Sequence, residues 1–204
     1  MRISSLIAIA AIPALCFCSS KSSPPPPSTL AGQATPDSFR VAFETTRGRF
    51  VIQVNRAWAP KGVERFRDLV EAGFFDKERF FRTIPAFVTQ SGLSANPDDN
   101  KAWDKPIGDD SVKQTNARGY LVFATQGPDT RTHQFFINLK DNANLDAMGF
   151  APLGKVVEGM AVVDSLYSGY GDDPDQMLIQ RQGNAYLDRT FPKLDEIKTA
   201  RILP

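Results

Sequence analysis

The stretch RFFRTIPAFVTQSG, residues 79–92, contains an arginine and a glutamine whose side chains could hydrogen-bond a bound molecule. Arg82 supplies a guanidinium and Gln90 an amide in a segment that is otherwise largely apolar. Further along the chain, Gln134 and Phe136 alternate with two more apolar residues, so an expected strand presents an amide and an aromatic ring on one face. Alternation alone favours a plainer interpretation, in which Arg82 pairs with a nearby acid and Gln134 faces water.

The sequence lacks the motifs of most covalent and metal-assisted chemistries. It contains no HExxH motif, no glycine-rich phosphate loop and no G-x-S-x-G motif. Its single histidine, His133, is expected at the surface or at a strand edge. Aspartates gather within residues 98–110 and again within 172–175, and we expect water rather than a metal ion around them. We therefore predict neither a metal nor a cofactor.

Residues 1–18 have the pattern of an export signal. Arg2 is followed by a short run of small and apolar residues that is too short to indicate a membrane span. A buried N-terminal helix is the alternative, but the run shows no amphipathic period. Both cysteines, Cys16 and Cys18, lie in this segment, so the domain that follows contains no thiol, disulfide or cysteine metal site. Lipidation of Cys18 and simple removal of the signal both remain open, because the surrounding residues fit a lipoprotein cleavage box only in part.

A proline- and serine-rich linker is expected at residues 19–37, before a folded domain at 38–204. Four consecutive prolines favour extended polyproline II structure there. The formal net charge of the chain is +1, and no block of like charge indicates a nucleic-acid groove or a polybasic membrane surface. We expect an exported bacterial protein, either periplasmic or a lipoprotein of the outer membrane or cell surface, with membrane contact only through the lipid.

Apolar periodicity predicts many strands and two helices in the folded domain. Alternation across residues 39–54, interrupted by the turn signal Thr46-Arg47-Gly48, predicts a hairpin. A long loop is expected at 93–116. Further strands are expected at 79–92, 120–125, 134–139, 149–159 and 194–203, and helices at 59–73 and 159–169. This pattern predicts a mainly β domain, with a closed or nearly closed antiparallel sheet whose open ends the helices cover.

Three blocks of the sequence resemble the cyclophilin family, in the family's order. FFRTIPAFVTQSG resembles the motif in which Phe-His-Arg is followed by Ile-Pro, Phe and Gln-Gly. YLVFATQGPDTRTHQFFI resembles the block in which Ala-x-x-Gly-Pro-x-Thr precedes Ser-Gln-Phe-Phe-Ile, and LDAMGFAPLGKVVEGMAVVDSL resembles the Leu-Asp and Phe-Gly-Lys-Val block. The similarity runs from about Phe39 to Leu203, and its tail is similar to exported bacterial members of the family.

The resemblance implies a closed eight-stranded antiparallel barrel capped by two α-helices, with peptidyl-prolyl cis-trans isomerase activity. By position, Arg82 matches the catalytic arginine and Gln90 the glutamine that hydrogen-bonds both substrate and arginine. The expected substrate-binding residues form a proline pocket and a groove for the flanking peptide. The pocket positions are Phe87, Val88, Phe136 and Leu145, and the groove positions are Ala124, Thr125 and Gln134.

Three positions depart from the family pattern. Phe81 stands in place of the usual histidine before the arginine, Asn144 in place of a tryptophan that many members carry, and Phe150 near the place of a pocket histidine. We include Asn144 and Phe150 among the expected substrate-binding residues. The arginine and glutamine are retained, so the catalytic prediction stands, while these departures bear on substrate preference.

Two other functions fit parts of the sequence. One is a non-catalytic peptide-binding module or chaperone that uses the same groove, and the other is a structural envelope protein tethered through Cys18. The second leaves the three blocks unexplained. The expected partners are proline-containing polypeptides, and the domain is expected to be a monomer.

Overall fold

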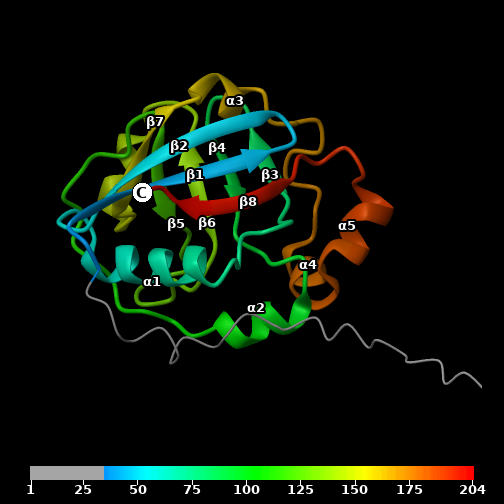
Figure 1. Ribbon diagram of the computed structural model, residues 1–204, viewed down its shortest axis with the longest axis horizontal. Coiled ribbons are helices and arrows are strands. Elements are labelled where there is room, and N and C mark those ends of the chain that lie inside the picture. The colour runs from blue at the N-terminus through cyan, green and yellow to red at the C-terminus, as the bar shows by residue number, and fades with distance from the viewer. Residues whose placement is uncertain (1–34) are drawn as a thin grey trace, which may run out of the picture.

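The computed structural model describes residues 35–204, shown in Figure 1. The predicted export signal and most of the predicted linker lie outside the described residues, and the first strand begins at Ser38. The strands are β1 (Ser38–Thr45), β2 (Gly48–Asn55), β3 (Arg82–Ile84), β4 (Val88–Ser91), β5 (Tyr120–Phe123), β6 (Phe135–Asn138), β7 (Pro152–Glu158) and β8 (Ile197–Ile202). The helices are α1 (Pro60–Glu71), α2 (Pro97–Trp103), α3 (Met160–Asp164), α4 (Gln176–Gln182) and α5 (Asn184–Thr190), with a 3₁₀ helix, η2, at Ala143–Met148.

All eight strands belong to one antiparallel sheet, in the order β3-β4-β6-β5-β7-β2-β1-β8. The sheet curls so that β1, β2 and β8 lie in front of β4, β5 and β6, while α1 lies across its lower end and α3 across its upper end (Figure 1). The predictions of a mainly β domain and of eight antiparallel strands are therefore confirmed.

The closed barrel predicted from the resemblance is not confirmed, because the edge strands β3 and β8 are not paired with each other. The sheet is a curled half-barrel. Its edges approach where residues 77–80, just before β3, meet the start of β8: the Lys77 N–H donates to the Ile197 carbonyl at 2.7 Å, and the Ile197 N–H donates to the Glu78 carbonyl at 2.8 Å. β3 itself has only three residues and does not extend this pairing.

The hairpin predicted at the start of the domain is confirmed. Thr45 is paired with Gly48, which leaves Thr46 and Arg47 as a two-residue turn. Because strand side chains alternate between faces, every second residue from Phe39 to Phe43 in β1 and from Phe50 to Val54 in β2 points inward. These residues, which all lie in the main core, are Phe39, Val41, Phe43, Phe50, Ile52 and Val54.

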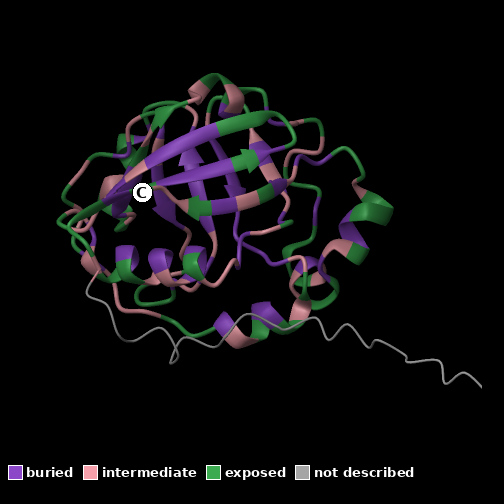
Figure 2. Ribbon diagram, viewed as in Figure 1, coloured by how far each residue is buried: buried purple, intermediate pink, exposed green. Residues whose placement is uncertain are grey.

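Phenylalanine rings fill the main core between the curled sheet and α1. Phe43 stacks on Phe50 with ring centroids 4.9 Å apart, and Phe135 meets Phe75 edge-on at 5.2 Å. Figure 2 shows most of the strand residues and the inner face of α1 as buried, whereas the outer side of α5 is exposed. A second cluster of apolar residues packs beneath α4 and α5 and contains Phe81, Leu93, Ile179, Tyr186, Leu187 and Leu194.

The prediction of two helices is correct for α1 and incomplete elsewhere. α1 begins at Pro60, whose ring suits the first turn of a helix, and its apolar stripe Val63, Phe66 and Val70 is buried in the core. α3 ends at Asp164, earlier than predicted. Beyond it, the Tyr167 N–H donates to the Asp195 carboxylate rather than to a carbonyl of the helix. Three further helices, α2, α4 and α5, lie in segments that were predicted as loop or left unassigned.

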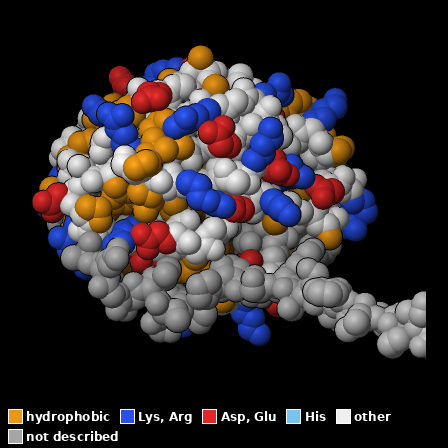
Figure 3. Space-filling model, viewed as in Figure 1, with side chains coloured by type: hydrophobic (Ala, Val, Ile, Leu, Met, Phe, Trp, Pro, Cys, Tyr) orange, Lys and Arg blue, Asp and Glu red, His pale blue; other side chains and the backbone are white. Residues whose placement is uncertain are grey.

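The surface of the described residues carries both signs of charge. Lys, Arg, Asp and Glu side chains are interspersed over the face drawn in Figure 3. Several form exposed ion pairs, among them Arg56 with Glu64 and Arg49 with Glu44. Within residues 35–204, every helix falls short of the length and apolar character that crossing a membrane requires.

The two neighbouring phenylalanines of β6 give a test of the sheet's faces. Phe135 lies in the main core, whereas Phe136 belongs to a separate small cluster on the opposite face. We expect Phe135→Ala to lower the free energy of unfolding by about 1 kcal/mol or more beyond the loss in Phe136→Ala, because its cavity opens where the surrounding rings are fully buried. Urea denaturation of both variants measures this difference. The reverse ranking would show that the faces of β6 are assigned wrongly.

Candidate active site

Arg82 and Gln90 face each other across a hairpin. The segment predicted as one strand is in fact two, β3 and β4, because the chain turns at residues 85–87, where Ala86 has a φ of 55°. The Phe87 N–H donates to the Ile84 carbonyl at 3.0 Å and closes the turn. Arg82 is paired directly with Gln90 in this register, so their side chains share one face. The eight-residue spacing seen in the sequence is thus the spacing of opposed residues in a hairpin.

A line of hydrogen bonds connects three polar side chains along this face. The Arg82 Nη1 donates to Gln90 Oε1 at 3.5 Å, and the Gln90 Nε2 donates to Gln134 Oε1 at 2.9 Å. A guanidinium can only donate, so it fixes the orientation of the Gln90 amide, which in turn fixes that of Gln134. Within residues 35–204 the Gln134 amide nitrogen has no acceptor, so this donor remains for a bound molecule.

Arg82 is also held from two other directions. Its Nε donates to the carboxylate of Asp172. The plainer interpretation is therefore correct in that this arginine pairs with an acid. The guanidinium carbon lies 5.6 Å from the centre of the Phe87 ring, within the range of a cation–π contact. The Arg82 side chain keeps 23% of its surface exposed, so it is held in place yet accessible.

An apolar floor lies beside this polar line. Val88, Val122, Phe136 and Leu145 form a small buried cluster with Phe87, Ala124 and Phe150 packed against it. Phe136 meets Phe150 edge-on, with ring centroids 5.6 Å apart. The floor and the polar side chains enclose a cavity of about 360 Å³, in which Arg82 is the only charged lining residue among those the structure describes.

The cavity brings together all but one of the predicted site residues. Asn144 is the exception: it is exposed on η2 and does not line the cavity, although its neighbour Leu145 does. Four lining residues were not predicted. Gln126, Thr130 and Thr132 lie inside a quoted block and could have been found there, whereas Gln176 comes from α4 and no sequence signal connects it to the site. The predicted residues that line the cavity are Arg82, Phe87, Val88, Gln90, Ala124, Thr125, Gln134, Phe136, Leu145 and Phe150.

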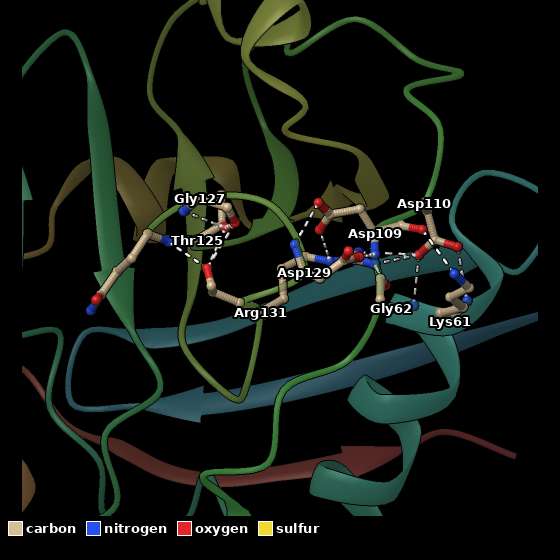
Figure 4. A network of polar contacts seen from close by, with 11 residues as sticks. Lys61, Gly62, Asp109, Asp110, Thr125, Gly127, Asp129 and Arg131 are labelled. Carbon is tan, nitrogen blue, oxygen red and sulfur yellow. Dashed lines mark hydrogen bonds and ion pairs between the residues drawn. The ribbon is translucent and has the colours of Figure 1, made fainter.

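A buried ion pair supports the wall that carries Thr125. Figure 4 shows this wall, residues 125–130, connected through Arg131 and two aspartates to the start of α1. Both guanidinium Nη atoms of Arg131 lie 3.1 Å from Asp110 Oδ2, and its Nε lies 3.1 Å from Asp109 Oδ1 at ion-pair distance. Asp109 and Asp129 are joined by two further hydrogen bonds, each from a backbone N–H to a carboxylate. The prediction that this acidic segment is merely solvated is therefore wrong for Asp110, which is buried.

Two buried titratable side chains support the backbone that follows Gln90. Glu78 Oε2 accepts from the Ser91 hydroxyl at 3.0 Å and from the Gly92 N–H at 2.8 Å. On the other side, His133 Nδ1 is hydrogen-bonded to the Gly92 carbonyl. The expectation of a surface or edge histidine is wrong, because His133 is buried against the Phe74 ring, 5.1 Å between centroids. Burial lowers the pKa of His133, which favours the neutral ring.

The Glu78 carboxyl gives the fold a pH dependence. Burial raises the pKa of Glu78 well above its ordinary value of 4.5, against the smaller opposing effect of its hydrogen bonds from Ser91 and Gly92. Since the folded protein holds this proton more tightly than the unfolded chain, the stability linked to Glu78 is full below about pH 4.5 and is lost as the pH rises toward the folded-state pKa. We expect the parent protein to lose stability relative to Glu78→Gln over that range.

Urea denaturation at a series of pH values measures this effect. Glu78→Gln keeps an oxygen for Ser91 and Gly92, and its amide takes the place of the unpartnered Oε1. His133 titrates in both proteins, so the difference between them isolates Glu78. Glu44→Gln, at a carboxylate that is half exposed, is the control and should run parallel to the parent. Parallel curves for Glu78→Gln as well would contradict the assignment of a raised pKa.

The arrangement suits binding and electrostatic stabilisation of a neutral peptide segment. Within residues 35–204, no group of three or more His, Cys, Asp and Glu side chains is placed to hold a metal ion. The cavity offers an apolar floor, one exposed cation and an amide donor in a line. An extended backbone with one apolar ring side chain fits these features, because the floor accepts the ring while the polar line meets its carbonyl and nitrogen atoms.

Comparison with known proteins identifies relatives. Residues 40–183 match the family model described as cyclophilin type peptidyl-prolyl cis-trans isomerase. The chain is 36% identical over 139 residues to peptidyl-prolyl cis-trans isomerase A of Dickeya dadantii, covering 65% of this chain and 73% of that protein. It is 36% identical over 135 residues to isomerase B of Escherichia coli, covering 62% and 82%. A cyclophilin-type isomerase of Cryptosporidium parvum, solved in the presence of the dipeptide Ala-Pro, has a similar fold, with a TM-score of 0.61 at 21% identity over 81% of this chain and 99% of that one.

Proposed function

The chain belongs to the cyclophilin-type peptidyl-prolyl cis-trans isomerase family, and we propose that it accelerates rotation about X-Pro bonds in exported or envelope proteins and so assists their folding. The observation that supports isomerase activity is the presence of a partly exposed guanidinium and an apolar floor in one cavity. The catalytic residues are Arg82 and Gln90.

The physical reason for the rate enhancement lies in the X-Pro bond itself. Amide resonance gives rotation a barrier of about 18–20 kcal/mol. At the twisted transition state the resonance is broken, so the proline nitrogen is pyramidal and carries a localised lone pair. Arg82 can stabilise that lone pair, which is unavailable in the planar ground state. An interaction that is stronger in the transition state than in the ground state is the condition for acceleration.

The other lining residues hold the substrate while the bond turns. The floor made by Val88, Phe136 and Leu145 accepts the proline ring and fixes one side of the rotating bond. Gln90 and Gln134 meet the flanking peptide backbone, with the Gln134 amide nitrogen as donor to a carbonyl. The apolar floor also limits water at the guanidinium, so its charge is less screened there than at an open surface. Neither a proton transfer nor a covalent step is required.

The exported location rests on the sequence before the described residues. The apolar run of residues 1–18 and the proline-rich residues 19–37 support an export signal followed by a spacer. We place the domain in the periplasm, or on the outer membrane or cell surface if Cys18 is lipidated. The partners are proline-containing polypeptides, a view supported by the relative that was solved with Ala-Pro. The domain acts as a monomer.

Two experiments test the two halves separately. The first measures isomerisation of a short X-Pro peptide by the purified domain 38–204. If the domain binds the peptide without accelerating its rotation, the protein is a peptide-binding module instead. The second expresses the full chain in a bacterium and follows its cell fraction and mass, alongside a Cys18→Ser variant. Retention of the parent in the cytoplasm with residues 1–18 attached would contradict export without affecting the first result.

A further inference from the structure

The contact between Arg82 and Asp172 connects the catalytic side chain to a distant loop. Asp172 lies in the segment between α3 and α4, 90 residues beyond Arg82. Its carboxylate takes the Nε edge of the guanidinium, while Gln90 takes Nη1 and the Phe87 ring lies beside the guanidinium. Nothing in the sequence distinguishes Asp172 from its acidic neighbours, around which water was expected. Its side chain is 67% exposed, so water still reaches the pair.

A buried cluster fixes the loop that carries Asp172. Phe81, the residue before Arg82, is buried in the second apolar cluster, against which Tyr170 packs. Tyr170 meets Phe191 edge-on at 5.0 Å, and the Asp173 N–H donates to the Tyr170 carbonyl at 2.9 Å. The side chains of Phe81 and Arg82 point to opposite faces because they are consecutive in an extended segment. Phe81 therefore packs against the loop on one face of the segment, while Arg82 pairs with the Asp172 carboxylate on the other face.

We propose that Asp172 is a positioning residue for the catalytic guanidinium, an inference that rests on the proposed isomerase function. Arginine loses about 2 kcal/mol of rotamer entropy when it is held in one conformation. An acceptor at Nε restricts the side chain before the substrate arrives and leaves Nη2 free to face the cavity. The opposing effect is partial neutralisation of the charge, and it is small here because the exposed carboxylate is screened by water.

The same contact completes the line of hydrogen bonds across the site. The guanidinium donates to Asp172 on one side and to Gln90 on the other, so the direction of the bonds through Gln90 to Gln134 is set at Arg82, and Asp172 holds the Nε edge of that donor in place. Asp172 thus acts on the substrate through Arg82, and through the amides beyond it. Phe81, which stands in place of the histidine usual in the family, packs in the same apolar cluster as Tyr170 of this loop.

The test compares two neighbouring aspartates in the full chain. We expect Asp172→Ala to lower kcat/KM by about three- to fivefold, mainly through kcat, because the floor that binds the proline ring is untouched. Asp173→Ala is the matched control: it removes the same charge from an exposed neighbour in the same loop and should leave kcat/KM unchanged. Asp172→Asn keeps an acceptor oxygen and should recover most of the loss.

A second readout is independent of activity. The Arg82 Nε–H gives an NMR signal that is assigned by its absence in Arg82→Lys, and we expect Asp172→Ala to shift it and speed its exchange with water. An unchanged signal, an equal loss in Asp173→Ala, or an unchanged or higher kcat/KM in Asp172→Ala would overturn the positioning role. If the parent itself fails to isomerise peptides, the proposed function fails, and the NMR signal still reports whether the pair forms.

Discussion

Arg82→Ala is expected to lower kcat/KM for X-Pro isomerisation by about 10²–10³-fold, the cost typical of removing one preorganised donor from an active site. The side chain is the only charged group lining the cavity among the described residues, so nothing there replaces it. A large part of the loss should be in kcat, because the guanidinium acts mainly on the twisted nitrogen and the proline ring binds elsewhere. A peptide isomerisation assay measures the effect, and a variant as fast as the parent would refute the assignment.

Two controls separate this loss from damage to the fold. Arg82 is partly exposed and lies outside the apolar clusters, so the melting temperature of Arg82→Ala should stay close to that of the parent. Arg82→Lys keeps the charge but places it on a compact ammonium that cannot address Asp172, Gln90 and a peptide at once. We expect this variant to recover little of the activity. Full activity in Arg82→Lys would show that charge alone is sufficient.

The strands were predictable because they follow a local rule. A half-buried strand alternates its side chains, and β1 and β2 follow that alternation except at Ala42 and Val51, which are also buried. α1 was equally clear, because a proline at its start and an apolar stripe agree on one helix. The hairpin of β3 and β4 was missed because its strands have three and four residues, too few to show that the chain reverses between them.

The short helices were not predictable from their own residues. α4 and α5 have seven residues each, a length at which packing rather than propensity decides. Their stability comes from the cluster around Phe81, which is almost 100 residues earlier in the chain than Ile179. α2 begins at Pro97 directly after its cap Asn96, and these two residues signal a helix start, but the polar residues that follow show no apolar stripe.

The site residues also fall into two groups, those within local motifs and those positioned by distant packing. The predicted residues were found because they lie within or next to the three local motifs, and the cavity brings all of them together except Asn144. Also missed, although they lie within a motif, were Gln126, Thr130 and Thr132. Asp172 and Gln176 were missed because they come from a segment whose position depends on distant packing. A local pattern can show that an arginine is present, but it cannot show which carboxylate will hold it.

Asp110 illustrates the same limit, and it carries the largest stability effect that we expect from an ion pair. α1 has no side-chain cap of its own and no acidic residue in its first turn. Asp110 supplies both from 48 residues away: its carboxylate accepts from the Lys61 N–H at 3.0 Å and from the Gly62 N–H at 2.9 Å. The positive end of the helix dipole and the Arg131 guanidinium together compensate a carboxylate that is 3% exposed.

Asp110→Ala is expected to lower the free energy of unfolding by about 3–5 kcal/mol, because it leaves Arg131 buried without its main partner and the start of α1 uncapped. At about 2–4 °C per kcal/mol the melting temperature should fall by roughly 6–20 °C. Arg131→Ala should cost less, since the remaining carboxylate keeps two backbone donors and the helix dipole. Thermal and urea denaturation of both variants measure this ranking.

Arg49→Ala is the matched control, because it breaks an ion pair of 3.5 Å in which both side chains are about half exposed. We expect it to cost less than about 1 kcal/mol. Peptide affinity adds a second measure: Asp110→Ala should weaken binding at temperatures where it remains folded, because Arg131 anchors the loop that carries Thr125 and Thr130. If Asp110→Ala proves no more damaging than Arg49→Ala, or less damaging than Arg131→Ala, then the buried carboxylate neither caps α1 nor compensates the guanidinium as the contacts indicate.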